Sequence, residues 1–269
     1  GERSVFDLSN DQLATLAAAR RAAAARDTPA ELRDRIAAVL HIDRAPAAPA
    51  VEPLAHAAAN RTENLSLLRP GRVSLAVRVA RPETPSGDLV LVVAPDGSST
   101  PLDAEPFTGW LAQGKTVAAL QLSGFGTGAI DPRRFWATEV FGPGVREYYL
   151  AFLNGRSLVG LRTEDLLAAA GPLTRHLACE HTHIHAVGGA AIPALHAAAL
   201  RPDLFRSTTL AGSIRSWEEV VTTPVPENQL ANTVHGALAV YDLPDLVGLA
   251  GGPERVTIVD RVDARGTPR

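Results

Sequence analysis

Several residue types are rare or missing in this sequence of 269 residues. It has no methionine, a single cysteine (Cys179) and a single lysine (Lys115). One cysteine excludes disulfides within the chain and leaves the redox environment open. No stretch approaches the roughly eighteen apolar residues of a membrane-spanning helix, so no membrane partner is expected. Because methionine is absent even at position 1, we expect a processed chain or a piece of a longer one.

An excess of charge of either sign is also lacking. The formal net charge is −3, with 20% charged and 46% hydrophobic residues, which is typical of a globular protein. Without a basic excess, a nucleic-acid partner is not expected. The basic residues are nearly all arginine and alanine is abundant, a composition that resembles high-GC bacterial proteins. The localisation is left open, with the bacterial periplasm or secretion as candidates.

Two helix signals precede a proline-rich segment. A capping-box pattern at Ser9 predicts a helix to about residue 26, and a second at Thr28 predicts a helix to about residue 40. The following residues are rich in alanine and proline, as in a semi-rigid linker. We therefore predict three parts: an N-terminal helical segment over 1–44, a linker over 45–62 and a main domain over 63–269.

The main domain alternates between strand and helix patterns. Residues 73–79 alternate in polarity, while 89–93 and 116–122 are continuous apolar runs. Such runs are typical of strands that are covered on both faces. Further strand patterns precede Gly188 and lie near 208–210 and 256–259, with helical patterns between them. The alternation predicts the α/β class, a mostly parallel sheet flanked by helices.

Residues 182–200 have the pattern of a buried strand, a glycine turn and an alanine-rich helix. A nucleophile elbow, G-x-S-x-G, has this pattern, with a serine on a strained turn above the sheet. Its five positions would be 188–192, which places Ala190 in the serine position and Ile192 in that of the last glycine. The sequence thus predicts the scaffold of an elbow without its nucleophile.

Three segments resemble the α/β-hydrolase superfamily and, within it, bacterial acetyl xylan esterase-like proteins. They are 188–200, 228–246 and 256–266, and the similarity extends from about residue 65 to the C-terminus. The resemblance implies an α/β-hydrolase fold and no cofactor. It also implies that the chain corresponds to the second half of longer members built from two hydrolase-like modules.

The resemblance carries over only part of the catalytic triad. Acyl transfer in this superfamily needs a nucleophile, an acid and a histidine, in that chain order. Asp263 matches the acid position, but Ala190 has no hydroxyl and no histidine follows His235. The alanine reflects either natural loss or an engineered Ser→Ala change, and Asp263 could instead cap a turn. As a stand-in base, His235 would reverse the usual order.

An oxyanion hole could still form from the backbone N–H groups of Ala191 and Gly97. Alone, such a hole supports weak catalysis or ligand binding. We therefore expect a non-catalytic or accessory half of an esterase, whose partner is a catalytic hydrolase module or an ester or carbohydrate ligand. The alternative is an active carboxylic ester hydrolase, engineered at Ala190 or with a rebuilt site.

His181, His183 and His185 alternate along the strand that precedes the elbow, so they project from one face of it. Imidazoles in this arrangement can bind zinc if a carboxylate from elsewhere completes the ligand set. A metal-binding protein that uses these three histidines is therefore a further alternative. The spacing is also compatible with histidines that form hydrogen bonds inside a core.

Overall fold

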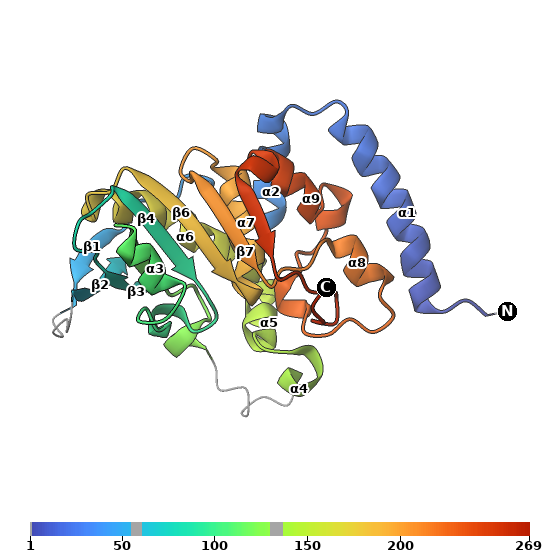
Figure 1. Cartoon of the computed structure of the whole chain (residues 1–269). Helices are drawn as coiled ribbons and strands as arrows, with labels where there is room; N and C mark the ends of the chain where they lie inside the picture. The colour runs from blue at the N-terminus through green and yellow to red at the C-terminus, as the bar shows by residue number, and fades with distance from the viewer. Residues whose placement is uncertain (1, 55–60, 130–136) are drawn as a thin grey trace.

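The centre of the protein is a twisted sheet (Figure 1). A computed structural model describes residues 2–54, 61–129 and 137–269 of the chain, and within these residues the sheet has eight strands in the order β1-β2-β3-β5-β4-β6-β7-β8. The strands are β1 (Ala50–Pro53), β2 (Thr62–Leu68), β3 (Leu75–Ala80), β4 (Asp88–Val93), β5 (Thr116–Leu120), β6 (His181–Val187), β7 (Ser207–Ala211) and β8 (Val256–Val259). Strands β4 to β8 are parallel, and β1 to β3 form an antiparallel edge.

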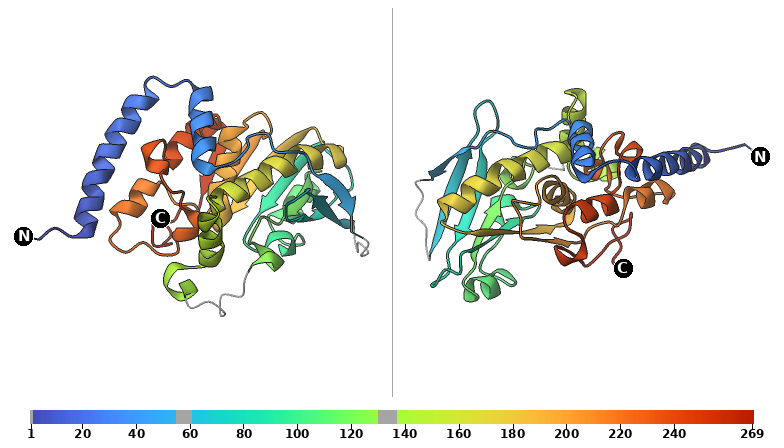
Figure 2. Two further views of the ribbon diagram at one scale, coloured as in Figure 1. Left: turned by 180° about the vertical axis from the view of Figure 1, so that it is seen from behind. Right: turned by 90° about the horizontal axis from the view of Figure 1, so that it is seen from above.

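Helices lie on both faces of this sheet (Figure 2). They are α1 (Val5–Ala24), α2 (Pro29–Leu40), α3 (Phe107–Ala112), α4 (Ala137–Phe141), α5 (Val145–Leu153), α6 (Leu158–His176), α7 (Ala191–Leu200), α8 (Trp217–Thr222) and α9 (Leu243–Leu249). Short 3₁₀ turns connect several of these elements. The predicted architecture, a mostly parallel sheet flanked by helices, is confirmed.

The two faces of the sheet carry cores of different size. The larger core packs α2, α6, α7 and α9 on one face, and all ten residues of α7 are buried. The smaller core lies under α3 on the opposite face, around Phe107, Val90 and Val117. The burial of β4 and β5 is nearly continuous, which explains why these strands have apolar runs rather than alternation.

Both N-terminal helices contact the main domain. Helix α2 begins at Thr28 as predicted, and Ile36 and Leu40 lie fully buried in the larger core. Helix α1 begins earlier than predicted, because its capping box is formed by Ser4 and Asp7 rather than by Ser9. Its Ser9 hydroxyl instead donates to a carbonyl within the helix.

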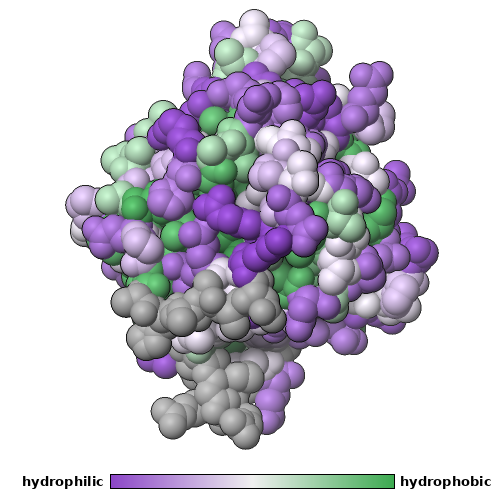
Figure 3. Space-filling view, turned by 60° about the vertical axis from the view of Figure 1, so that its left-hand side comes forward, coloured by the Kyte–Doolittle hydropathy of each residue, from purple (hydrophilic) through white to green (hydrophobic). Residues whose placement is uncertain are grey.

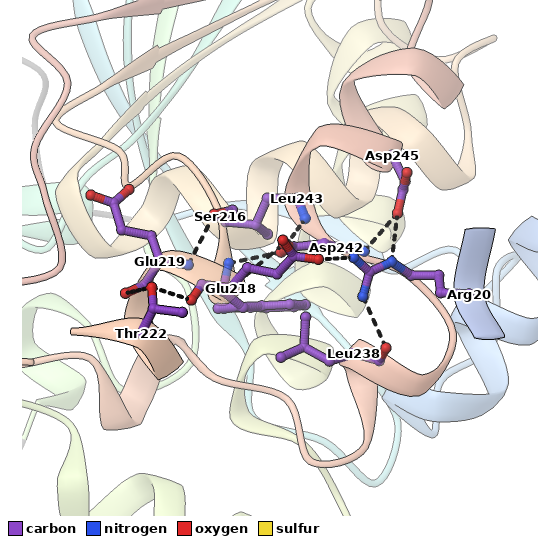
Figure 4. Close-up of polar contacts among 10 residues, drawn as sticks. Arg20, Ser216, Glu218, Glu219, Thr222, Leu238, Asp242, Leu243 and Asp245 are labelled. Atoms are coloured by element: carbon purple, nitrogen blue, oxygen red, sulfur yellow. Dashed lines mark hydrogen bonds and ion pairs between the residues drawn. The ribbon is translucent and has the colours of Figure 1, made fainter. Parts of the chain in front are cut away.

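A buried arginine attaches α1 to α8 and α9 (Figure 4). The Arg20 side chain is 9% exposed, forms an ion pair with Glu218, and lies 3.6 Å from the Asp245 carboxylate. Its Nη1 also donates to the carbonyl of Leu238 at 2.9 Å. Asp242, at the N-cap of α9, accepts the backbone N–H of Trp217 at 2.7 Å, which joins α9 to α8.

The segment predicted as a linker contains regular structure that the sequence reading missed. Residues 50–53 form β1, which pairs antiparallel with β2, and β2 begins at Thr62. Part of the predicted linker, 55–60, lies outside the described residues. No helix in the described part of the chain is long and apolar enough to cross a membrane. On the face drawn in Figure 3, hydrophilic and hydrophobic residues are intermixed over most of the surface.

Candidate active site

A cavity of about 420 Å³ opens at the carboxyl ends of the parallel strands. Ligands of open α/β sheets bind at this edge. The segments after all five parallel strands contribute to its lining, through Pro95, Gly124, Gly188, Gly212 and Val262. The cavity has an apolar part, formed by Phe125, Val145, Ile192 and Ile214, and a polar part that includes Arg162, Asn228, Gln229 and Asn232.

The turn between β6 and α7 forms the floor of this cavity. Gly188 directly follows the last residue of β6 and has a positive φ of 55°, a conformation that is accessible to glycine at little cost. Gly188 and Gly189 both line the cavity. A sharp, strained turn directly after a strand is the position at which an elbow presents its nucleophile. Here that position carries no side chain.

Ala190 has different geometry from the one its predicted role requires. It has ordinary right-handed helical angles, φ −84° and ψ −15°, and is fully buried within the larger core. It is not among the residues that line the cavity. Small residues occupy every position from 188 to 191, and among these four Gly188 is the one with a positive φ.

The two predicted oxyanion donors already have backbone partners. The N–H of Gly97 donates to the carbonyl of Ala94 at 2.9 Å, and the N–H of Ala191 donates to the carbonyl of Gly188. Neither residue lines the cavity. The predicted pair is thus not arranged as an oxyanion hole, which needs donors directed at the reacting oxygen.

Asp263 caps the turn in which it lies. Its Oδ1 accepts the backbone N–H groups of Arg265 at 2.9 Å and Thr267 at 3.0 Å. The hydrogen bonds from Thr267 and Arg265 hold the pKa of the Asp263 carboxyl below its usual value. The neighbours Val262 and Gly266 line the cavity, whereas Asp263 does not. This geometry matches the turn-capping alternative.

The three histidines of β6 do lie on one face of the strand, but they have separate environments. His183 Nδ1 is 2.7 Å from Ser207 Oγ, and its Nε2 is 3.5 Å from the Asp88 carboxylate. The His185 ring packs edge-on against Trp110 of α3, with ring centroids 5.0 Å apart, and His181 is exposed. Burial lowers the pKa of His183 and of His185.

No group of three His, Cys, Asp or Glu side chains in the described ranges is close enough to hold a metal ion. The predicted face for His181, His183 and His185 is thus present, but the ligand set that zinc would need does not form around it. Among the other histidines, His235 packs against Phe152 with ring centroids 6.0 Å apart and does not line the cavity.

The sequence reading missed Arg162, the buried cation of the cavity. It lies in α6, is 2% exposed, and its guanidinium carbon is 3.8 Å from the centroid of the Phe125 ring. Its Nε donates to the carbonyl of Ser123 at 3.0 Å. Desolvation lowers its pKa to about 10, an effect that the charges of Glu147 and Asp165 oppose, so Arg162 stays protonated at pH 7.

A signal for Arg162 was available in the sequence. Residues 162–165 read Arg-Thr-Glu-Asp inside an otherwise apolar helix, and all four are buried. Buried charges are normally paired. Glu164 pairs with two arginines, Arg72 and Arg156, and Asp165 pairs with Arg69. A run of charges in an apolar helix therefore indicates a buried polar network, although not which member faces a cavity.

Comparison with known proteins agrees with this architecture. The sequence matches no protein-family model and no curated protein. A solved structure from Bacteroides fragilis, a candidate acetyl xylan esterase, aligns with a TM-score of 0.69 at 10% identity, over 97% of this chain and 76% of that one. Acetyl xylan esterase 1 from Thermoanaerobacterium aligns with a TM-score of 0.49 at 15% identity, over 88% and 79% of the two chains.

At 10% identity the first alignment reports the fold rather than the chemistry. It covers 97% of this chain. The chain has the α/β-hydrolase fold, in an acetyl xylan esterase-like form.

Proposed function

We propose that this chain is a non-catalytic, esterase-like module that keeps the cavity of an α/β-hydrolase but has lost its triad. One observation carries the proposal: the elbow position between β6 and α7 is occupied by Gly188, which has no nucleophilic atom. Without a nucleophilic atom, the covalent acyl-enzyme intermediate of acyl transfer does not form at this position.

The other two triad members are also without support in the geometry. No histidine is found among the described residues that line the cavity. Ser213 is the buried hydroxyl in that lining, and it donates to the carbonyl of Ile214 at 3.2 Å rather than to a base. The Asp263 carboxylate accepts hydrogen bonds from the backbone of its own turn, at Arg265 and Thr267. A serine without a base is a weak nucleophile at neutral pH.

The remaining capacity of the site is binding. A volume of about 420 Å³ falls within the usual range for small-molecule sites, roughly 300–1,000 Å³. The structural relatives named as acetyl xylan esterases suggest an ester or carbohydrate ligand, or a catalytic hydrolase module as the partner of an accessory half. Because the cavity is formed in this chain, we favour a ligand over a protein module as its partner.

The test is hydrolysis of p-nitrophenyl acetate by the unaltered protein, Gly188→Ser and Ala190→Ser. We expect no rate above the buffer reaction in any of the three, because a hydroxyl at 188 still lacks a base and one at 190 faces the core. Turnover by the unaltered protein would overturn the proposal and favour the active-hydrolase alternative. Turnover by Gly188→Ser alone would show that a base survives and that only the nucleophile was lost.

Three further measurements separate the remaining alternatives. Titration calorimetry with acetylated xylo-oligosaccharides tests the carbohydrate ligand, and co-purification with a catalytic esterase module tests the accessory role. Elemental analysis of the purified protein tests the metal alternative. Stoichiometric zinc that is lost in a His183→Ala/His185→Ala double variant would support that alternative against the proposal.

A further inference from the structure

We infer that the cavity at Gly188 is a receptor for a small organic monocarboxylate with an apolar body, and that the Arg162 guanidinium binds its carboxylate. This deepens the proposed binding role of the same cavity and rests on it.

Arg162 differs from the charged residues beside it. Glu164 and Asp165 are each neutralised by arginine partners. Within the described parts of the chain, by contrast, Arg162 has no ion pair, and its only hydrogen bond is from Nε to the carbonyl of Ser123. A guanidinium has five N–H donors, so the terminal nitrogens of Arg162 keep most of their donor capacity. The charges of Glu147 and Asp165 offset part of its desolvation cost, but neither carboxylate forms an ion pair with it, so a bound anion would add a direct partner for this buried charge.

The terminal nitrogens lie at the cavity. Nη2 is 3.5 Å from where a Cβ would stand at Gly124 and 3.7 Å from the equivalent point at Gly144. Both glycines line the cavity together with Arg162. Neither glycine carries a side chain, although the Glu147 side chain lies beside Gly124, with its Cγ 3.2 Å from the same point. A planar guanidinium at a cavity wall can bind a carboxylate through two parallel hydrogen bonds.

Other parts of the cavity wall also favour one negative charge. Helix α7 starts from the cavity floor with no side-chain cap and no acidic residue in its first turn, so its positive dipole end is not compensated there. Two carboxylates, Glu147 and Glu227, also line the cavity, and Arg146 is the other cation. The two cations are thus matched by two carboxylates, so the lining has no excess of cations for a doubly charged ligand, which favours a monoanion over phosphate or a dicarboxylate.

The rest of the wall indicates the body of the ligand. Phe125, Val145, Ile192, Ile214 and Val262 supply apolar surface, and Phe125 also stacks on Arg162. An aryl or alkyl group there would be removed from water while its carboxylate meets the guanidinium. The carboxylate that hydrolysis of an ester releases combines an apolar body with one negative charge, whereas the intact neutral ester lacks the charge.

The experiment uses two probes of the same shape on the unaltered protein. 4-Phenylbutyrate carries the carboxylate, and 4-phenylbutyramide replaces it with a neutral amide. Calorimetry should show at least about tenfold tighter binding of the carboxylate, since hydrogen bonds to a charged group are worth roughly 1.5–3 kcal/mol. Equal affinity for the two probes, or no binding of the carboxylate, would overturn the inference.

Variants then identify the cation. Arg162→Gln should abolish the preference for the carboxylate, and Arg162→Lys should retain part of it. Arg146→Gln is the matched control, because Arg146 lines the same cavity but is exposed. Thermal melts establish that each variant is folded. If Arg146→Gln and Arg162→Gln reduce the preference for the carboxylate probe equally, Arg162 is not the group that binds the carboxylate.

Failure here is distinguishable from failure of the proposed function. If the protein hydrolyses p-nitrophenyl acetate but prefers the carboxylate probe, non-catalysis is wrong and Arg162 is a product or substrate contact. If hydrolysis is absent and the two probes bind equally, the module is non-catalytic and Arg162 has only a structural role.

Discussion

His196 offers a quantitative test of how the core behind the elbow is built. It lies within α7, is fully buried, and its ring packs against Trp217 and Tyr241. Its Nδ1 is 2.7 Å from the carbonyl of Ile192, and its Nε2 is 2.9 Å from the hydroxyl of Tyr241. Because a carbonyl only accepts, Nδ1 carries the proton and the neutral ring accepts the tyrosine hydrogen at Nε2.

Burial lowers the pKa of His196 from 6.5 to about 4. The unfolded chain therefore binds a proton between these two values while the folded protein does not. The resulting stability is complete above pH 6.5 and is lost as the pH falls toward 4. One pKa unit corresponds to about 1.36 kcal/mol, so the full contribution is about 3 kcal/mol, of which about 2 kcal/mol is lost between pH 7 and pH 5.

Urea unfolding at pH 7, 6 and 5 measures this loss. We expect His196→Gln to be less stable than the unaltered protein at pH 7, because Tyr241 loses its acceptor. Its free energy of unfolding should nevertheless fall about 2 kcal/mol less between pH 7 and pH 5. His176→Gln, at an exposed position of α6, should keep the original pH dependence. Equal pH dependence of His196→Gln and the unaltered protein would refute the reasoning.

Two further predictions concern how the N-terminal helices attach. Gly160→Ala should destabilise the fold by about 1–3 kcal/mol, because its Cβ would lie 2.4 Å from the carbonyl oxygen of Leu40; Gly248→Ala, which meets no atom within 4 Å, should be neutral or stabilise by up to about 1 kcal/mol. Arg20→Ala should lower the free energy of unfolding by about 1–2 kcal/mol. Arg3→Ala, which removes an exposed ion pair with Asp11 of the same helix, should lower it by less than about 0.5 kcal/mol, and urea unfolding measures both. A silent Gly160→Ala would mean that α2 is not closely packed on α6, and equal costs for the two arginines would mean that Arg20 does not anchor α1.

The parallel strands were predictable from the sequence because burial alone determines their pattern of apolar residues. Strands β4 and β5 are covered on both faces, so nearly every residue must be apolar. The edge strand β1 was not predictable in the same way. It is four residues long, ends at Pro53, and is mostly exposed, so its composition resembles that of a linker.

Helix starts show the same contrast. The cap at Thr28 was predictable because the Thr28–Glu31 pair is followed at once by an apolar helical pattern. At the first helix, two capping patterns compete within nine residues, at Ser4 and at Ser9. Ser4 forms the cap through reciprocal hydrogen bonds with Asp7. The residue types alone do not show whether this pair or the pair of Ser9 and Gln12 forms such bonds.

The elbow shows why the site was harder to predict than the fold. Every residue of α7 is buried, and the helix contacts α2, α6, α9 and β7, so close packing favours a small residue where the helix begins, at Ala190 and Ala191. At these two fully buried positions packing alone accounts for alanine, whether or not a nucleophile is present. The position of a missing side chain therefore cannot be identified from residue size alone. It requires the backbone, in which the positive φ of Gly188 marks the turn.

Buried charge carries the functional information that residue size does not. A glycine at the elbow position is compatible with packing alone, but the burial of an arginine has a desolvation cost that packing does not offset. Arg69, at 8% side-chain exposure, meets that cost with the carboxylate of Asp165. Arg162, at 2% exposure, faces a cavity instead. The cavity beside Gly188 thus contains a buried cation that has no ion pair among the described residues, and this is why its burial, rather than the size of the residues around it, points to a carboxylate ligand.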